Sequence, residues 1–216
     1  MKKAFIMLLL IFPVFTFSQT NKFIFGIEGG LNLSSLRGKQ DYFLDKSPKI
    51  GFLTGVTAQY PFNKKIAFKS GIYLENKGSK GVAVRMSDLN GVVLGQAKGF
   101  NNFNYLHIPF LFKTTFGNKA RFFANAGPNI GFLIKQTTRV EQTGNFNGYK
   151  ENLTEFYKKI ELGISGGLGF SIPLNEKSIF SIEIRDNLGL TNVNKENGFP
   201  EKTNSINFLF GISRMF

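Results

Sequence analysis

Eight segments of this 216-residue chain alternate between apolar side chains and polar or small ones. A period of two places successive side chains on opposite faces of an extended strand, whereas a helix repeats every 3.6 residues. Most of the segments run about 10–13 residues, and a tilted strand needs ~9–11 residues to cross a bilayer. They cover residues 23–34, 49–60, 66–75, 105–113, 122–134, 160–172, 180–190 and 206–216.

The last of these segments has one strongly apolar face, formed by Phe208, Phe210 and Ile212 and continued by Phe216. In water, a strand edge of this kind would promote aggregation. In a closed barrel within a bilayer, the same strand pairs with the first segment and turns its apolar face to lipid. We therefore expect residues 206–216 to close a transmembrane barrel against residues 23–34.

The connections between the segments alternate in length. Three are tight turns with Asn at the third position, Pro61–Lys64, Phe116–Lys119 and Pro173–Glu176, and Asn suits turns because it tolerates positive φ and bonds to its own backbone. The other four are long and cover residues 35–48, 78–102, 136–158 and 192–205. An even number of strands with short periplasmic turns and long extracellular loops is typical of outer-membrane barrels.

Two of the long connections contain local signals. Asp88–Gly91, between two Val-rich triplets, predicts a small hairpin above the membrane, and Asn152–Lys159 predicts a helical turn. The sequence thus predicts an all-β, eight-stranded, antiparallel up-and-down transmembrane β-barrel.

A soluble, lipocalin-like barrel is the alternative, with its apolar face inside. The polar face argues against it, because this face is rich in Gly and Ser and poor in Lys. The interior of an eight-stranded barrel is just wide enough for side chains, so small residues suit it. The unequal connections and the apolar final segment also favour the membrane barrel.

Residues 1–18 resemble a secretory signal peptide. Lys2 and Lys3 precede an apolar run, Ala4–Phe17, which is too short to span a bilayer as a helix. Small residues at Thr16 and Ser18 predict cleavage before Gln19, which leaves residues 19–216 as one barrel domain. A short membrane anchor is the alternative. No later stretch is long and apolar enough for a transmembrane helix.

The composition excludes several kinds of function. With no Cys and a single His, the chain offers no disulfide, no thiol ligand and little histidine chemistry. The net charge of +13 is spread over turns, loops and strand ends, so it indicates an anionic membrane surface rather than nucleic acid. We expect outer-membrane lipid and anionic lipopolysaccharide as partners, and no cofactor or metal.

Several strands carry motifs of a known family. Tyr105–Lys113 (YLHIPFLFK) resembles the YLxIPLLxK strand of the PorT-like outer-membrane β-barrel proteins of Bacteroidetes, and Phe25–Leu36 resembles their GxKGGLNxSxL first strand. Phe123–Ile134 is similar to their GxGPYxGYLL strand, and the sixth and seventh segments also match. The resemblance implies an outer-membrane barrel of eight strands. One member of the family acts in type IX secretion, so a secretion role is one expectation.

Parity places eight ionisable residues inside the barrel. These are Glu28, Lys69, Glu75, His107, Lys113, Glu161, Glu183 and Arg185. Charges in a narrow interior must pair, so we expect a salt-bridge plug, and the alternative is a narrow proton or ion path. The chain has no Gly-x-Ser-x-Gly elbow and no second His. We therefore expect a polar structural role for His107 and no catalytic site, although a barrel-embedded lipid hydrolase is a further alternative.

Function is expected in one of three forms: a structural or interaction protein at the cell surface, an accessory to protein secretion, or a narrow solute channel. The apolar face of the last segment, formed by Phe208, Phe210, Ile212 and Phe216, resembles the signal that the barrel assembly machinery reads. Arg214 shares this face near its end, and we expect it at the periplasmic rim, where it can reach lipid headgroups.

Overall fold

The computed structural model describes residues 23–38, 47–81, 84–87, 93–117, 120–144, 148–196 and 200–216. The predicted signal peptide and its cleavage site lie outside these residues. Eight strands form the barrel wall: β1 (Ile24–Gly38), β2 (Ser47–Pro61), β3 (Ile66–Lys80), β5 (Val93–Phe116), β6 (Arg121–Gly144), β8 (Ile160–Pro173), β9 (Ser178–Gly189) and β10 (Glu201–Met215).

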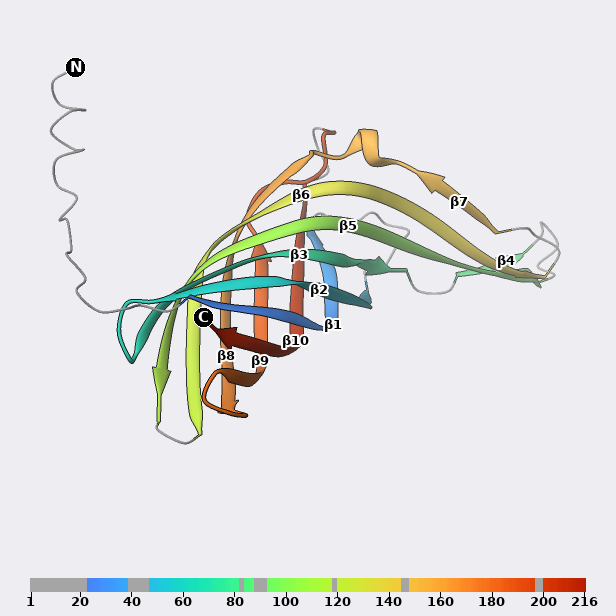
Figure 1. Ribbon diagram of the computed structural model, residues 1–216. Helices are drawn as coiled ribbons and strands as arrows, with labels where there is room; N and C mark the ends of the chain where they lie inside the picture. The colour runs from blue at the N-terminus through green and yellow to red at the C-terminus, as the bar shows by residue number, and fades with distance from the viewer. Residues whose placement is uncertain are drawn as a thin grey trace, which may run out of the picture.

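Each wall strand pairs antiparallel with its neighbours along the chain, as Figure 1 shows. The first and last strands close the ring, with β1 and β10 in continuous register from Ile24 opposite Met215 to Gly38 opposite Glu201. Closure leaves the wall without an open edge. The predicted fold, an eight-stranded up-and-down transmembrane barrel, is confirmed.

The two faces of the wall differ as the alternation predicts. On β10, the outward Phe208 is 48% exposed, whereas the inward Leu209 is 1% exposed. Exposed Phe, Ile and Leu side chains continue around the outside on every wall strand. An apolar outer belt over a polar interior suits lipid and not water, so the soluble alternative is wrong. Within the described residues, no helix has the length and apolar character needed to cross a membrane.

Asparagine side chains hold two of the tight turns together. Asn63 Oδ1 accepts hydrogen bonds from the backbone N–H groups of Lys65 and Ile66, both at 2.8 Å. Asn175 Oδ1 does the same for Lys177 at 3.0 Å and Ser178 at 2.8 Å. The turn role predicted for Asn is confirmed at these two positions, and Asn118 of the third turn lies outside the described residues.

Strands β5 and β6 are 24 residues each and remain paired far beyond the barrel wall. Two short strands flank them there: β4 (Val84–Ser87) pairs with β5, and β7 (Tyr149–Asn152) pairs with β6. These four strands form a sheet, here called the projecting sheet, that extends away from the end with the tight turns (Figure 1).

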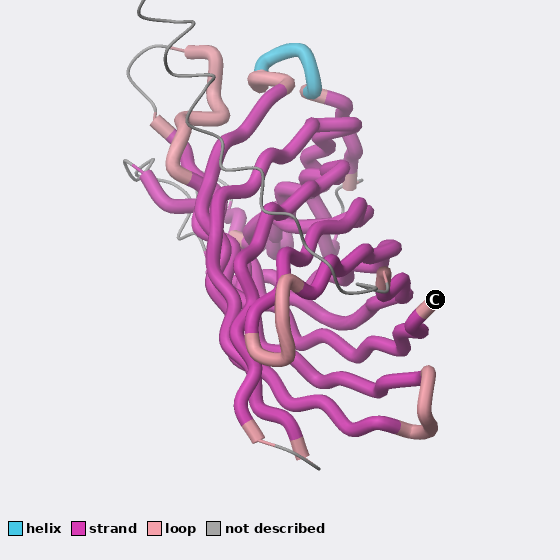
Figure 2. The backbone as a smooth tube through the Cα atoms, turned by 60° about the vertical axis from the view of Figure 1, so that its left-hand side comes forward, coloured by secondary structure: helices cyan, strands magenta, loops and turns pink. Residues whose placement is uncertain are grey.

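The projecting sheet corrects the expectation of long loops at 78–102 and 136–158, because most of both stretches is strand. The connection expected at 192–205 is also shorter, since β10 begins at Glu201. The expected hairpin exists as β4 paired with the start of β5, although the tip at Asp88–Gly91 lies outside the described residues. The helical turn is present as the short 3-10 helix η1 (Thr154–Phe156), drawn in cyan in Figure 2.

A β-bulge marks the boundary between the wall and the projecting sheet. Asn104 pairs with Lys135, whereas the next residue, Tyr105, pairs with Leu133, so Ile134 is the extra residue of β6. Bulges bend a strand and reset the direction of its side chains. Beyond this bulge, the inward residue of β6 is Gln136, which is fully buried.

Candidate functional site in the barrel lumen

Alternation along the wall strands turns polar side chains from many strands into one interior. Seven of the eight predicted lumen residues are at most 6% exposed, and Lys113 is half-buried. The structure divides them into a central cluster, an outer cluster nearer the projecting sheet, and Lys113 apart from both.

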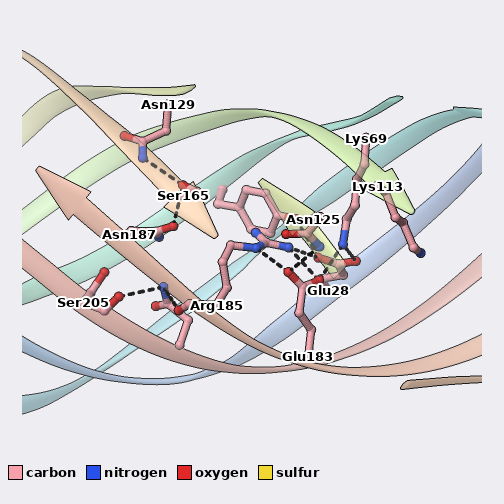
Figure 3. A network of polar contacts seen from close by, with 12 residues as sticks. Glu28, Lys69, Lys113, Asn125, Asn129, Ser165, Glu183, Arg185, Asn187 and Ser205 are labelled. Carbon is pink, nitrogen blue, oxygen red and sulfur yellow. Dashed lines mark hydrogen bonds and ion pairs between the residues drawn. The ribbon is translucent and has the colours of Figure 1, made fainter. Parts of the chain in front are cut away.

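The central cluster consists of Glu28, Lys69, Glu183 and Arg185, drawn in Figure 3. Lys69 Nζ lies 2.6 Å from Glu28 Oε1 and 2.8 Å from Glu183 Oε2. Arg185 Nε donates to Glu183 Oε1 at 2.6 Å, and Arg185 Nη2 lies 3.3 Å from Glu28 Oε2. Two cations and two carboxylates therefore form a closed, mutually neutralising network, as buried charges require.

Neutral groups complete this network. Tyr73 Oη donates to Glu28 Oε2 at 2.6 Å, and Asn125 Nδ2 donates to Glu183 Oε1 at 2.9 Å. The guanidinium of Arg185 also lies 5.4 Å from the centre of the Tyr73 ring, a cation–π distance. Both carboxylates thus receive hydrogen bonds from cations and from neutral donors, which favours one fixed arrangement.

The outer cluster is built around two carboxylates. Lys77 Nζ pairs with Glu161 Oε2 at 2.8 Å, and Thr203 donates to the other oxygen of Glu161. Glu75 accepts a hydrogen bond from Ser205 Oγ at 2.6 Å, and His107 Nδ1 lies 3.5 Å from its second oxygen.

Sequence analysis missed Lys77, because the third segment was ended at Glu75. Continuing the same parity by one more step would have placed Lys77 inside the barrel. The structure does extend β3 to Lys80, and Lys77 is 2% exposed. The cation that balances Glu161 was therefore present in the pattern but was assigned to a loop.

Glycines on the lumen face make room for the large buried side chains. A Cβ added at Gly55 would lie 2.7 Å from Cδ1 of Tyr73, and one added at Gly211 would lie 2.8 Å from Cγ of Glu28. Real Cβ atoms do not approach so closely, so these positions require glycine. Elsewhere on this face the nearest atom is a backbone oxygen of the neighbouring strand, as for Gly30 and Gly127, so the abundance of Gly follows from close strand packing as well as from bulky side chains.

The chemistry available in the lumen is ion pairing. In a Ser–His–carboxylate triad the imidazole lies between the hydroxyl and the acid, whereas here the Glu75 carboxylate lies between Ser205 and His107. That order leaves Ser205 without the imidazole base of such a triad. Within the described residues, no group of three or more His, Cys, Asp or Glu could hold a metal ion.

The predicted assembly face lies on the outside of the barrel. Phe208, Phe210, Ile212 and Phe216 are 48–68% exposed. Phe216 packs edge-on against Phe25 at 5.9 Å, and the Arg214 guanidinium lies 5.8 Å from the centre of the Phe216 ring. Arg214 is exposed at the end with the tight turns, as expected.

The family that most of this chain matches agrees with this architecture. Residues 17–195 match the family described as outer membrane protein beta-barrel domain. The solved structure of Neisserial surface protein A is similar at 11% identity, with a TM-score of 0.45 over 89% of this chain and 97% of that chain. OprG from Pseudomonas aeruginosa is similar at 15% identity, with a TM-score of 0.44 over 91% and 97%.

The structure of Ail, the attachment invasion locus protein of Yersinia pestis, is similar at 13% identity, with a TM-score of 0.41 over 89% of this chain and 98% of that chain. A sequence search of curated proteins gives no match. The family match covers most of the chain, and the lipid-facing belt agrees with it. This outer-membrane β-barrel protein belongs to the outer membrane protein beta-barrel domain family.

Proposed function

We propose that this protein is a PorT-like structural and interaction protein of the outer membrane, with a closed lumen and no catalytic activity. The observation that carries the proposal is the ion-paired lumen, in which the central cluster joins side chains from β1, β3 and β9 across the bore. An eight-stranded barrel leaves little space beyond its side chains, so these contacts favour a plug over a path for ions.

The projecting sheet supports an interaction role at the cell surface. It places exposed basic side chains, including Lys135, Arg139 and Lys150, outside the membrane-spanning wall. Such residues suit the anionic sugars and phosphates of lipopolysaccharide. An accessory role in protein secretion is the second candidate, favoured by the PorT-like motif at Tyr105–Lys113.

Planar-bilayer recording of the purified barrel tests the closed lumen. We expect no steady single-channel conductance from the natural protein. A triple variant removes the bulk of the central cluster: Lys69→Ser, Glu183→Ser and Arg185→Ser. It should conduct ions if it folds, and heat-modifiable migration on a gel reports whether it has folded. Steady conductance from the natural protein would contradict the plug and favour the solute channel.

A deletion strain separates the two interaction roles. Loss of secreted cargo with an intact outer membrane would favour the secretion accessory. Increased outer-membrane permeability with normal secretion would favour the structural role. Complementation with a variant whose projecting sheet is shortened at residues 81–99 then shows whether the sheet is needed for either phenotype.

A further inference from the structure

The barrel end with the tight turns opens into a cavity of about 800 Å³. We call this cavity the vestibule. Its walls come from the β2–β3 turn, the β5–β6 end of the wall, and the nearby ends of β1, β8, β9 and β10. By the orientation of outer-membrane barrels, the vestibule faces the periplasm. Its size lies in the range of pockets that hold small ligands.

The charges that line the vestibule have one sign. Lys64, Lys65, Lys113 and Arg121 are among its lining residues, and none of the lining residues that the structure describes is Asp or Glu. Lys64 and Lys65 are exposed on the β2–β3 turn, while Lys113 lies deeper on the inward face of β5. Clustered cations beside a low-dielectric wall produce a positive potential that attracts anions.

Lys113 is not neutralised by the lumen network. Its Nζ donates to Gln59 Oε1 at 3.1 Å and lies 4.0 Å from the centre of the Phe123 ring. Within the described part of the chain, it forms no ion pair with a carboxylate. Figure 3 shows its ammonium pointing away from the central cluster, whose two cations and two carboxylates already balance one another. The positive charge of Lys113 therefore acts on the vestibule.

We propose that the vestibule binds a phosphate-bearing anion. A phosphate monoester carries close to two negative charges and three acceptor oxygens. It therefore matches a site with several ammonium groups and a guanidinium better than a ligand with a single carboxylate would. Hydroxyls of Thr115, Ser181 and Ser213 also line the cavity.

Apolar walls accompany these donors. Ile66, Ile179 and Met215 line the same vestibule, so the cavity has room for an uncharged part of the ligand next to the phosphate. The phosphate group has two sources in the periplasm: a small phosphate ester in solution, or the headgroup of an anionic phospholipid in the inner leaflet. Both present non-bridging phosphate oxygens to the cations, with close to two negative charges on a monoester and one on a diester headgroup.

Calorimetric titration of the folded full chain in a non-ionic maltoside detergent tests the proposal. The probes are inorganic phosphate and dihexanoyl-phosphatidylglycerol. The double variant Lys64→Gln/Lys65→Gln should weaken binding by at least about tenfold, as expected for lost hydrogen bonds between charged groups. Lys113→Gln should weaken phosphate binding to a similar extent. Lys64 and Lys65 are exposed on a turn, so the double variant should fold and tests the site even if Lys113→Gln does not fold.

The chain offers a matched control in Lys158 and Lys159, another exposed pair of adjacent lysines, at the opposite end of the barrel. Lys158→Gln/Lys159→Gln makes the same change in charge and should leave the affinity unchanged. Binding of inorganic phosphate supports a soluble ligand, and tighter binding of the lipid supports a headgroup. Three results overturn the proposal. These are no saturable binding of either probe, equal losses of affinity in the two double variants, and tighter binding of an Asp-rich peptide than of either probe.

Discussion

Arg185 is fully buried and contacts both carboxylates of the central cluster. Parity alone placed it inside the barrel, because a strand alternates its faces. Sequence could not indicate which of the eight predicted charges would meet, since that depends on the register and tilt of neighbouring strands. The separation of Lys113 from the central cluster and the approach of His107 to Glu75 are properties of the closed barrel.

Removing Arg185 leaves two buried carboxylates with one cation. We expect Arg185→Ala to lower the free energy of unfolding by about 3–5 kcal/mol, the usual cost of breaking a buried pair. Urea unfolding in detergent micelles, followed by circular dichroism, measures it. Arg139→Ala is the control, because the Arg139–Glu141 pair is about half exposed and such pairs contribute ~0–1 kcal/mol. Similar losses in both variants would contradict the central role of Arg185.

Glycines allow a second test at the residue scale. Gly55→Ala would push a methyl group against the Ile72 carbonyl oxygen and the Tyr73 ring, so we expect a loss of about 1–3 kcal/mol from overpacking. Gly166→Ala provides the comparison, since a Cβ there would meet no atom within 4 Å. The same unfolding assay should show little change for Gly166→Ala. A neutral Gly55→Ala would show that the β3 backbone at Ile72 and the Tyr73 ring can both shift without cost.

The strands were predictable where one face meets lipid and the other meets the lumen. Where the outward face of β5 and β6 no longer meets lipid, polar residues occupy both faces, so stretches such as Asn101–Asn104 and Thr137–Arg139 show no clear alternation, although Phe103 and Thr137 are buried. Period-two patterns report a difference in side-chain polarity between the two faces of a strand, and in these stretches that difference is weak. This explains why the projecting sheet was expected as loops, while the wall strands were placed within a few residues.

Proline on β6 leaves the strand register undisturbed, although Pro128 removes a donor from the ladder and bulges are common at such positions. The register of β6 with β8 passes through Gly127 opposite Ser165 and Pro128 opposite Ile164 without a shift. The bulge lies at Ile134 instead, where the wall ends.

The outward face of β10 is proposed to direct assembly. We expect Phe216→Asp to reduce the amount of barrel inserted in the outer membrane several-fold, because it replaces an aromatic ring on the lipid-facing edge with a charge. Heat-modifiable protein in outer-membrane fractions measures this. Phe156→Asp makes the same change at another exposed Phe, on η1, and should leave insertion unchanged. Equal insertion of both variants would contradict the assembly role.

For the whole molecule, the number of strands and the order of short and long connections were sufficient to predict the closed barrel. The absence of Cys from the sequence also allows its orientation to be measured. We expect a membrane-impermeant maleimide to label Lys150→Cys on β7 in intact cells, and Lys64→Cys only after the outer membrane is permeabilised. Both side chains are exposed. Labelling of Lys64→Cys in intact cells would show the reverse orientation.

Closure between β1 and β10 has a consequence for the rate of folding. The two strands that meet are separated by nearly the whole described chain, yet they pair in continuous register along the full length of both. Contacts between residues so distant in sequence form slowly, because the loop must be closed before they contribute. The seam between β1 and β10 is therefore expected to form last. Until then, the sheet has two unprotected edges, and this interval sets how long the chain depends on periplasmic chaperones.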